Sequence, residues 1–336
     1  MSVYLYLYSK KPIARDAIER VIYALDFKPI GDSHGRWYWW FDEENYKSVC
    51  GCKLIISKPD PNDPSMPIGT QNVLYAVVHG LRSYEDVEMQ NNVIRRLRSV
   101  FGGSVYNDGD GRHSYAKNYI PRLSPAEKRC GLIYGSFLIN LGRALFALSD
   151  IQPEFNKRQQ LLGEFASFDK GLITNNLVTV FLVSILETFL KDFFIAFVEM
   201  HPDLQEKIYE KQSKIDFQTL RALLGKEKTL AEVEAENYTF QNLGSANQAY
   251  LNYLKINLYD LWNKKRKFNN RFYKIREAVE ELMQLRHKIV HTAYLNPNLD
   301  KAEVDKYRKI VESAGSLLAE SLEKKDFRID LDKYLF

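Results

Sequence analysis

The segment Leu177–Val198 constrains the fold of this chain more than any other part of the sequence. It reads LVTVFLVSILETFLKDFFIAFV, and its charged residues are Glu187, Lys191 and Asp192. An apolar segment of this length forms either a helix buried on all sides or a membrane-spanning helix. Because the charges interrupt the apolar run, we predict the core of a long buried helix over 171–200 and no membrane span.

The chain is long enough for two domains. Its 336 residues are 45% hydrophobic and 27% charged, as in ordinary globular proteins, and the net charge of +4 is too small to mark a nucleic-acid binder by itself. Two prolines in Ile120–Pro125 mark the best boundary. We therefore predict an α+β domain over 1–119, a linker over 120–125, a helical domain over 126–325 and a tail over 326–336.

The first 119 residues alternate between strand and helix patterns. Aromatic and β-branched runs predict strands, and three- to four-residue apolar spacing predicts helices. The expected strands are 3–8, 36–41, 49–57 and 72–78, with helices after Pro12 and over 84–100 and a closing hairpin over 104–106 and 112–119. This βαβββαβ order predicts an α+β sandwich, an antiparallel or mixed sheet covered by two helices.

Beyond the linker the pattern is helical almost to the end of the chain. We expect helices over 124–149, after Pro153, and over 171–200, 245–262, 268–294 and 300–322. The tail FRIDLDKYLF at 327–336 alternates apolar and polar residues. This alternation indicates either a strand added to a sheet or a segment that binds a neighbouring chain.

The helix expected over 268–294 carries the residues with the clearest chemical potential, Arg286, His287 and His291. An arginine presents a permanent charge and a planar fork of donors that match a phosphate. A histidine exchanges a proton near neutral pH, so the two could cleave RNA without a metal. On an ideal helix, Arg286 and His291 lie about 140° and 7.5 Å apart, so two copies around a twofold axis would build a shared cleft more easily than one helix alone.

The run from Arg286 to His291 resembles the R-x4-6-H motif of the HEPN superfamily, all-helical domains found in many metal-independent endoribonucleases. That family often has Asn, Asp or His directly after the arginine, and His287 fits. The segment Leu177–Val198 is similar to the long core helix of these domains, including Glu-x-Phe-Leu-Lys at Glu187–Lys191. The resemblance covers about residues 126–325 and leaves the first 120 residues outside it.

The resemblance implies a homodimeric endoribonuclease of a bacterial defence, abortive-infection or toxin system, with RNA as its partner and no cofactor or metal. Arg286 would stabilise charge on the phosphate and His291 would be the general acid/base. His287 would contribute as a further polar group, and Glu187 and Lys191 would orient the site from the core helix. The α+β domain would meet an inhibitor or sensor partner. Three cysteines, too few for a disulfide framework, suit a cytoplasmic protein.

A basic run precedes the motif and predicts a rail for an RNA backbone leading towards Arg286. Phe268, Phe272 and Tyr273 lie among its cations, as in surfaces that bind nucleic acid. The alternative is an ordinary solvent-exposed loop that binds no RNA, because such loops have the same composition. The residues expected to contact RNA are Lys264, Lys265, Arg266, Lys267, Arg271 and Lys274.

Other interpretations stay open. His287 and His291 are i and i+4, which suits zinc, although no third ligand follows nearby. Arg286 could be a surface ion-pair partner and His291 a capping residue. The helical domain could be a non-catalytic dimerisation or RNA-binding module, or a dimeriser for an active α+β domain. Finally, the aromatic run from Arg36 to Trp40 could stack single-stranded bases or pack a core on one face and a partner domain on the other.

Overall fold

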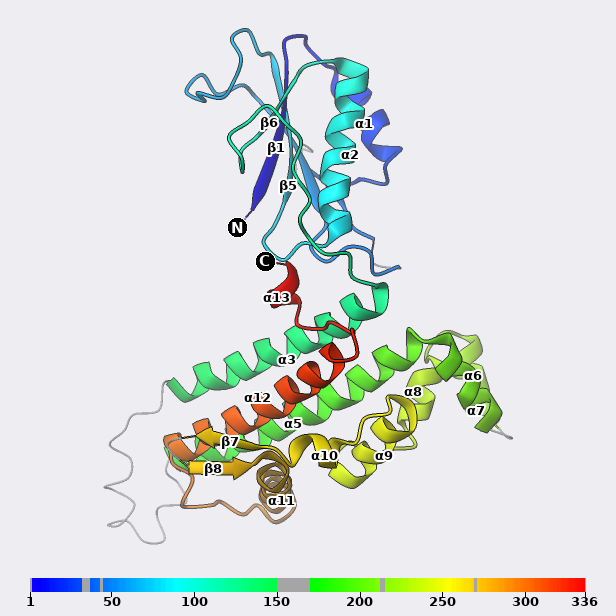
Figure 1. Ribbon diagram of the computed structural model, residues 1–336, viewed down its shortest axis with the longest axis vertical. Coiled ribbons are helices and arrows are strands. Elements are labelled where there is room, and N and C mark those ends of the chain that lie inside the picture. Colours follow the sequence, from blue (N-terminus) through cyan, green and yellow to red (C-terminus); the bar gives the residue numbers. More distant parts are fainter. Residues whose placement is uncertain are drawn as a thin grey trace. The chain divides into compact units, whose positions relative to one another are not determined.

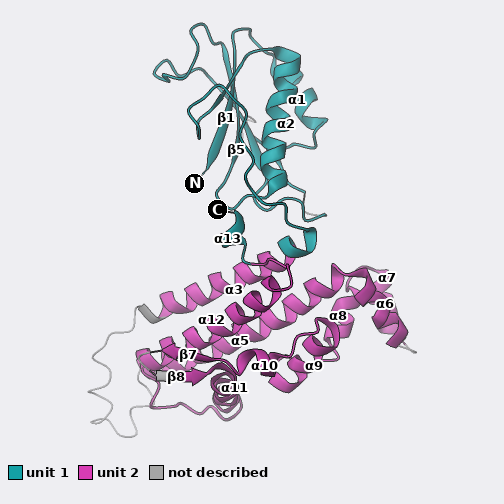
Figure 2. Ribbon diagram, in the orientation of Figure 1, with its two compact units in different colours: residues 1–128, 330–336 teal, residues 129–329 magenta. Residues whose placement is uncertain are grey.

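The chain forms two compact units. In the computed structural model, residues 2–31, 37–42, 45–149, 170–211, 215–268 and 271–335 are described. Unit 1 comprises residues 1–128 and 330–336, and unit 2 comprises 129–329 (Figure 2). Their boundary falls within helix α3 (Pro125–Ser149). The two units are described separately below.

Unit 1 is built on a six-stranded antiparallel sheet in the order β2-β3-β4-β5-β1-β6. Two helices lie together on one side of this sheet (Figure 1). The predicted α+β class is confirmed. Its elements are β1 (Val3–Ser9), α1 (Arg15–Tyr23), β2 (Lys28–Pro29), β3 (Trp37–Trp40), β4 (Cys52–Ser57), β5 (Asn72–Val78), α2 (Tyr84–Phe101), β6 (Ser104–Asn107) and α13 (Leu331–Leu335).

The alternation in β1 explains how the sheet buries one face. Successive side chains on a strand point to opposite sides, so Leu5 and Leu7 share one side and Tyr4 and Tyr6 the other. Leu5 and Leu7 are fully buried in the core beneath α1 and α2, whereas the two tyrosines are half-buried on the opposite face. Both α1 and α2 therefore lie on the side of the sheet that carries Leu5 and Leu7.

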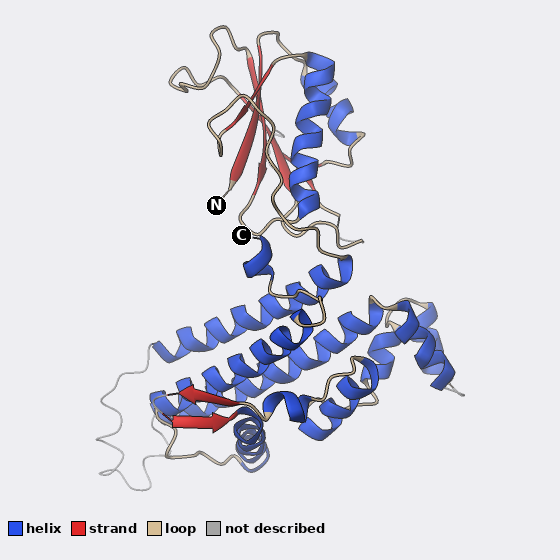
Figure 3. Ribbon diagram, in the orientation of Figure 1, coloured by secondary structure: helices blue, strands red, loops and turns tan. Residues whose placement is uncertain are grey.

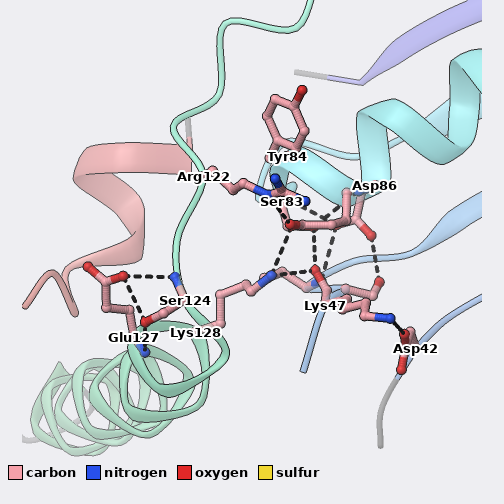
Figure 4. Close-up of polar contacts among 12 residues, drawn as sticks. Asp42, Lys47, Ser83, Tyr84, Asp86, Arg122, Ser124, Glu127 and Lys128 are labelled. Carbon is pink, nitrogen blue, oxygen red and sulfur yellow. Dashed lines mark hydrogen bonds and ion pairs between the residues drawn. The ribbon is translucent and has the colours of Figure 1, made fainter. Parts of the chain in front are cut away.

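Asp86 connects α2 to the turn before β4. Ser83 caps the helix by accepting from the Asp86 backbone N–H at 3.1 Å, while the Asp86 carboxylate accepts from the Ser83 N–H at 2.8 Å (Figure 4). The same buried carboxylate also accepts hydrogen bonds from Ser48 Oγ (2.5 Å), Val49 N, Cys50 N and Gly51 N (3.1 Å each). One side chain thus fixes a helix start and a four-residue turn.

Unit 2 is a helical bundle with one small hairpin (Figure 3). Besides most of α3, it contains α5 (Lys170–Glu199), α6 (Pro202–Lys211), α7 (Phe217–Leu224), α8 (Leu230–Ala235), α9 (Leu243–Tyr253), α10 (Leu258–Trp262), β7 (Lys265–Phe268), β8 (Arg271–Lys274), α11 (Ile275–Thr292) and α12 (Lys301–Glu323). The core helix predicted over 171–200 is α5, and the helical class is confirmed.

Helix α5 organises this core as its composition predicts. It packs against α6, α8, α9, α11 and α12, and its buried side chains are apolar with few exceptions. Phe189 stacks on Phe137 of α3 with ring centroids 4.4 Å apart. At the start of α5, Asn176 donates to the Asn296 carbonyl and accepts from the Asn296 N–H, which joins the end of the α11 loop to this helix.

The helix predicted over 268–294 begins later than expected. Residues 265–268 and 271–274 pair as an antiparallel hairpin, and α11 starts only at Ile275. The segments KRKF and RFYK alternate along the chain, and the register places Lys265, Lys267, Phe272 and Lys274 on one face of the hairpin. The two-residue alternation of a strand is therefore the pattern that this segment adopts, and the helical spacing that includes Phe272 is not.

Several other boundaries differ from the expectations. The helix predicted over 245–262 is divided into α9 and α10 by a turn in which Lys255 has a φ of 56°. The expected hairpin at 104–119 is reduced to β6 and a single bridge from Asn107 to Arg112. The tail forms the short helix α13 instead of a strand, because Leu331 and Leu335 are i and i+4 and both are buried. The helix expected after Pro153 lies outside the described residues.

Among the described residues, one helix is long and apolar enough to cross a membrane by composition. It is Pro125–Ala147, with 33% of its apolar window buried inside the protein. Core helices of globular proteins meet the same two criteria, so length and composition alone do not assign it a membrane role.

Candidate functional site

Helix α11 presents two different faces. Ile275, Val279 and Leu282 point into the core at three- and four-residue steps, and Ile289 continues the same stripe. The opposite face carries Gln284, His287, Lys288 and His291, all exposed. Because Arg286 follows Leu282 by four residues, the helical period turns its side chain towards the core side.

Arg286 reaches across to α5. Its Nη2 atom lies 3.9 Å from Glu187 Oε2, with side-chain exposures of 16% for Arg286 and 11% for Glu187. Burial raises the pKa of Glu187, and the nearby Arg286 charge opposes that shift. Arg286 Nε is buried and has no hydrogen-bond partner among the described residues. The guanidinium is therefore held by one carboxylate at the limit of ion-pair distance, and its Nε–H donor lacks an acceptor among the described residues.

The two histidines of α11 lie together at the surface. Their ring centroids are 4.3 Å apart with an interplanar angle of 41°, as expected for residues at i and i+4. Both side chains are exposed. Both imidazoles are thus open to a ligand from solvent or from another chain.

Two neighbouring hollows run along this part of unit 2. One cavity of about 540 Å³ is bordered on α11 by Glu280, Gln284 and His287, and on the other side by Gln241 and Tyr259. A second cavity of about 330 Å³ is lined by residues of α5 and of the segment between α8 and α9, including Glu187, Thr188, Lys191, Tyr238 and Gln241. Gln241 lines both cavities, so they adjoin at this residue.

The residues expected to form the site fall into two groups. The structure brings Arg286 together with Glu187, and His287 together with His291. Lys191 is exposed and lines the smaller cavity together with Glu187. The 140° separation expected on an ideal helix agrees with Arg286 facing α5 while His291 faces outward.

The basic run forms the β7–β8 hairpin at the opposite end of α11 from His291. Directly opposed residues in an antiparallel pair share a face, so Lys265, Lys267, Phe272 and Lys274 lie on one side. Lys265 and Lys267 are exposed, as is Lys264 before the strand, and Phe272 is 69% exposed. On the other side, Arg266 pairs with Glu320 of α12 at 2.8 Å.

Two further cations of the basic run are Lys274, which is already ion-paired, and Arg271, whose side chain is not described. Lys274 pairs with Glu277 at 2.6 Å on the first turn of α11. The side chain of Arg271 lies outside the described atoms. Eleven residues of helix separate Ile275 from Arg286, which corresponds to about 16 Å. A rail leading from the hairpin to Arg286 therefore has to follow the length of α11.

The zinc interpretation lacks a ligand set among the described residues. No group of three His, Cys, Asp or Glu side chains in that part of the chain converges as metal ligands. Structural zinc sites use four protein ligands and catalytic sites use three. His287 and His291 alone do not meet either requirement.

Sequence reasoning missed the residues that close the cavities opposite α11 and α5. Gln241 lies in a short polar segment between α8 and α9, and Tyr259 lies on α10. Tyr259 also receives the Arg276 guanidinium over its ring at 4.0 Å. Nothing in the local pattern distinguishes these residues, because their position opposite α11 arises only from tertiary packing, including that of α10 against α11.

Comparison with known proteins identifies the helical region. A model of the HEPN family described as RiboL-PSP-HEPN matches residues 146–324, just over half of the chain. The first 145 residues fall outside this match. Neither the curated proteins nor the solved structures contain a significant match to the chain. The HEPN resemblance inferred from Arg286 to His291 and from the core helix is confirmed: this chain belongs to the RiboL-PSP-HEPN family.

Proposed function

We propose that this protein is a metal-independent endoribonuclease whose site is built around Arg286 and His291. HEPN domains are generally ribonuclease folds, which gives the nucleic-acid chemistry its first support. In this proposal Arg286 stabilises charge on the scissile phosphate and His291 transfers the proton. His287 assists as a neighbouring polar group, and Glu187 orients the arginine from α5.

The observation that carries the proposal is the state of Arg286. A buried donor without an acceptor costs about 1–3 kcal/mol, so proteins rarely leave one without a function. Arg286 Nε is such a donor within the described residues, while Nη2 is kept near Glu187. A phosphate oxygen offers the acceptor that the guanidinium lacks, and an arginine presents its donors in the fork that phosphates match.

The reaction needs only groups already present in RNA and on α11. The ribose 2′-oxygen attacks phosphorus, and its proton passes to a histidine acting as general base. The bond from phosphorus to the 5′-oxygen breaks, and the leaving oxygen takes up a proton from the imidazolium formed in the first step. The products are a 2′,3′-cyclic phosphate and a 5′-hydroxyl. Arg286 would stabilise the extra negative charge on the phosphoryl oxygens during this exchange.

A homodimer is part of the proposal because one helix directs its two functional groups apart. Twofold packing would bring Arg286 and His291 of both chains to one groove. Exposed apolar side chains on the motif-bearing helices support such packing. They are Leu177 (60%) and Phe181 (43%) on α5, Val290 (49%) on α11, and Tyr294 (43%) just after it.

The biological setting is proposed from the same resemblance. We infer a cytoplasmic defence, abortive-infection or toxin nuclease that an inhibitor or sensor restrains through unit 1. Cys50, Cys52 and Cys130 are free thiols, which suits a reducing compartment. A ribonuclease needs restraint in the cell that makes it, and a second domain is a natural place to receive that signal.

The direct test is incubation of the purified protein with RNA in excess EDTA. We expect cleavage to persist and to leave 2′,3′-cyclic phosphate and 5′-hydroxyl ends, which end-labelling and mass spectrometry distinguish. Activity that disappears on chelation and returns with zinc or magnesium would refute the assignment and favour metal catalysis.

The hairpin face makes a separate prediction about RNA binding. Lys265→Gln combined with Lys267→Gln should weaken binding and reduce the slope of log Kd against log salt by about 1–2, because fewer counterions are released. The matched variant Arg266→Gln removes a cation on the other face of the hairpin that already pairs with Glu320 of α12, so its slope should change less. Equal slopes for the wild type and the double variant would show that this face does not touch RNA.

A further inference from the structure

The face of the unit 1 sheet opposite α1 and α2 carries a row of aromatic side chains. The strand register places Trp37, Ile55, Tyr75, Tyr6 and Tyr106 directly opposite one another from β3 to β6. Opposed residues in antiparallel strands share a face, so this row crosses almost the whole sheet. Tyr6 is in ring contact with Tyr75 at 5.3 Å and with Tyr106 at 6.4 Å between centroids. Four of five side chains in the row are therefore aromatic.

The β3 end of this face is open. Trp37 is 44% exposed and Trp39 is 37% exposed, whereas the other two tryptophans of the chain, Trp40 and Trp262, are buried. The β1 end is more closed, because the Tyr8 hydroxyl bonds to Asp63 and Ser65 of the loop before β5. Large exposed tryptophans on one face of a strand are typical of surfaces that bind a flat ligand or a partner.

Trp39 is held in a fixed orientation. Its indole N–H donates to the Cys50 carbonyl at 3.4 Å, and its ring stacks on Phe41 with centroids 4.9 Å apart. Gly51, with a φ of 74°, leaves room for the indole, since a Cβ there would collide with the indole nitrogen and the Trp40 carbonyl. The turn that contains Cys50 and Gly51 is the one held by the Asp86 carboxylate. These contacts fix the orientation of the Trp39 ring in the absence of a ligand.

Cations flank the same tryptophan. Lys28 of β2 and Lys53 of β4 are directly opposite Trp39 in the register, so both lie beside it on this face. The tyrosine end differs, because burial and the nearby Asp108 raise the pKa of Tyr6 to about 12. Positive charge therefore accompanies the exposed tryptophans, while acidic groups lie near the partly covered tyrosines. This arrangement favours an anionic ligand with planar groups at the β3 end.

We propose that the face formed by Trp37, Trp39, Phe41, Lys28 and Lys53 binds single-stranded RNA by stacking its bases and neutralising its phosphates. Aromatic rings with neighbouring cations are what sequence-tolerant single-strand binding requires, because every base has a π-face. A duplex keeps its bases stacked on each other and cannot offer them to these rings. A second copy of the same patch would add positive charge without adding an acidic residue to pair with it, which is unfavourable.

This surface goes beyond the nuclease assignment, because it lies in the unit that no family model covers. It would capture RNA without taking part in its cleavage. Binding there is measurable with RNA that cannot be cut, so its test does not depend on the activity of Arg286 or His291. The exposed tryptophans also supply their own signal, since stacked bases quench indole fluorescence.

The experiment uses the full-length protein and a short oligouridine with methylated 2′-hydroxyls, which lacks the nucleophile for cleavage. We expect saturable quenching of tryptophan fluorescence. With 4-thiouridine in the same oligomer, ultraviolet crosslinks should map to peptides of β3 and β4. Trp37→Ala with Trp39→Ala should reduce crosslinking to unit 1 and weaken binding roughly 10- to 100-fold. The conservative double variant, Trp37→Phe with Trp39→Phe, should retain crosslinking because stacking is preserved.

Tyr119→Ala is the matched control, because Tyr119 is an aromatic residue of unit 1 that is 80% exposed and lies outside the sheet. It should bind RNA as the wild type does. Absence of both quenching and unit 1 crosslinks in the unsubstituted protein would overturn the proposal, whatever the folding of the variants. Equal quenching by duplex RNA would overturn it as well. So would a change of oligomeric state in the tryptophan variants with unaltered RNA binding, which would identify a protein interface.

Discussion

His291→Ala should reduce metal-independent RNA cleavage by at least about 100-fold, the usual contribution of a general acid or base. The expected cause is loss of proton transfer at the ribose 2′-oxygen or at the leaving 5′-oxygen. Because His291 is exposed at the end of α11, its removal should leave the fold intact. Initial cleavage rates in EDTA, with circular dichroism of the same samples, measure both effects.

His287→Ala provides the comparison within the same helix. The two rings lie 4.3 Å apart and are similarly exposed, so the variants alter nearly the same surface. We expect His287→Ala to retain more activity than His291→Ala. A reversed order would assign the acid/base role to His287, and equal wild-type activity in both variants would exclude this helix as the catalytic element.

Mixing two inactive variants tests whether the site is shared between chains. Arg286→Ala and His291→Ala chains, refolded together, form heterodimers if the protein is a dimer. If each site takes its arginine from one chain and its histidine from the other, a heterodimer contains one intact site and regains activity. If each site lies within one chain, every site in the mixture lacks one group. A fully active monomer in solution would exclude the shared cleft.

Asp86→Ala should lower the free energy of unfolding of unit 1 by about 3–5 kcal/mol. The substitution removes the acceptor of several buried donors at once, and each unsatisfied donor carries a desolvation penalty. The donors that lose their acceptor are Ser48 Oγ and the backbone N–H groups of Val49, Cys50, Gly51 and Ser83. Urea unfolding followed by tryptophan fluorescence reports on this unit, since Trp37, Trp39 and Trp40 lie in it.

Two variants separate this effect from a general loss of charge. Asp16→Ala removes an acidic group on α1 that is 77% exposed and forms a surface ion pair with Arg20 at 3.9 Å. This variant should change the free energy of unfolding by less than about 0.5 kcal/mol. Asp86→Asn keeps the volume but replaces one acceptor oxygen with a donor, and should lose a large part of the stability. A cost below about 1 kcal/mol for Asp86→Ala would show that water replaces the carboxylate.

Long or strongly biased patterns in the amino-acid sequence were enough to specify the elements that contain them. Leu177–Val198 has too much apolar surface for a helix exposed to water, and α5 buries most of this surface in the core of unit 2. The alternation in β1 accounts for the burial of Leu5 and Leu7 on the side of the sheet that faces the helices. Arg286 to His291 indicated the family because residue types at fixed spacing are a local property of the chain.

Weaker local patterns were resolved by their surroundings. The basic run around Phe272 satisfied both a helical and an alternating pattern, and pairing of β7 with β8 beside α12 selected the hairpin. The tail at 327–336 alternated as a strand does, yet burial of Leu331 and Leu335 selected a helical turn. In each case a few residues allowed two backbone conformations of similar energy, so packing made the choice.

The site depends most on tertiary structure. Glu187 and Arg286 are about a hundred positions apart in the sequence, and only the packing of α5 against α11 set them 3.9 Å apart and enclosed Arg286 Nε. The row from Trp37 to Tyr106 likewise follows from strand register, which joins residues from several strands that no local spacing relates. Local sequence specifies which way a side chain turns on its own helix or strand. What it meets there is fixed by long-range packing, because the partner comes from a distant part of the chain.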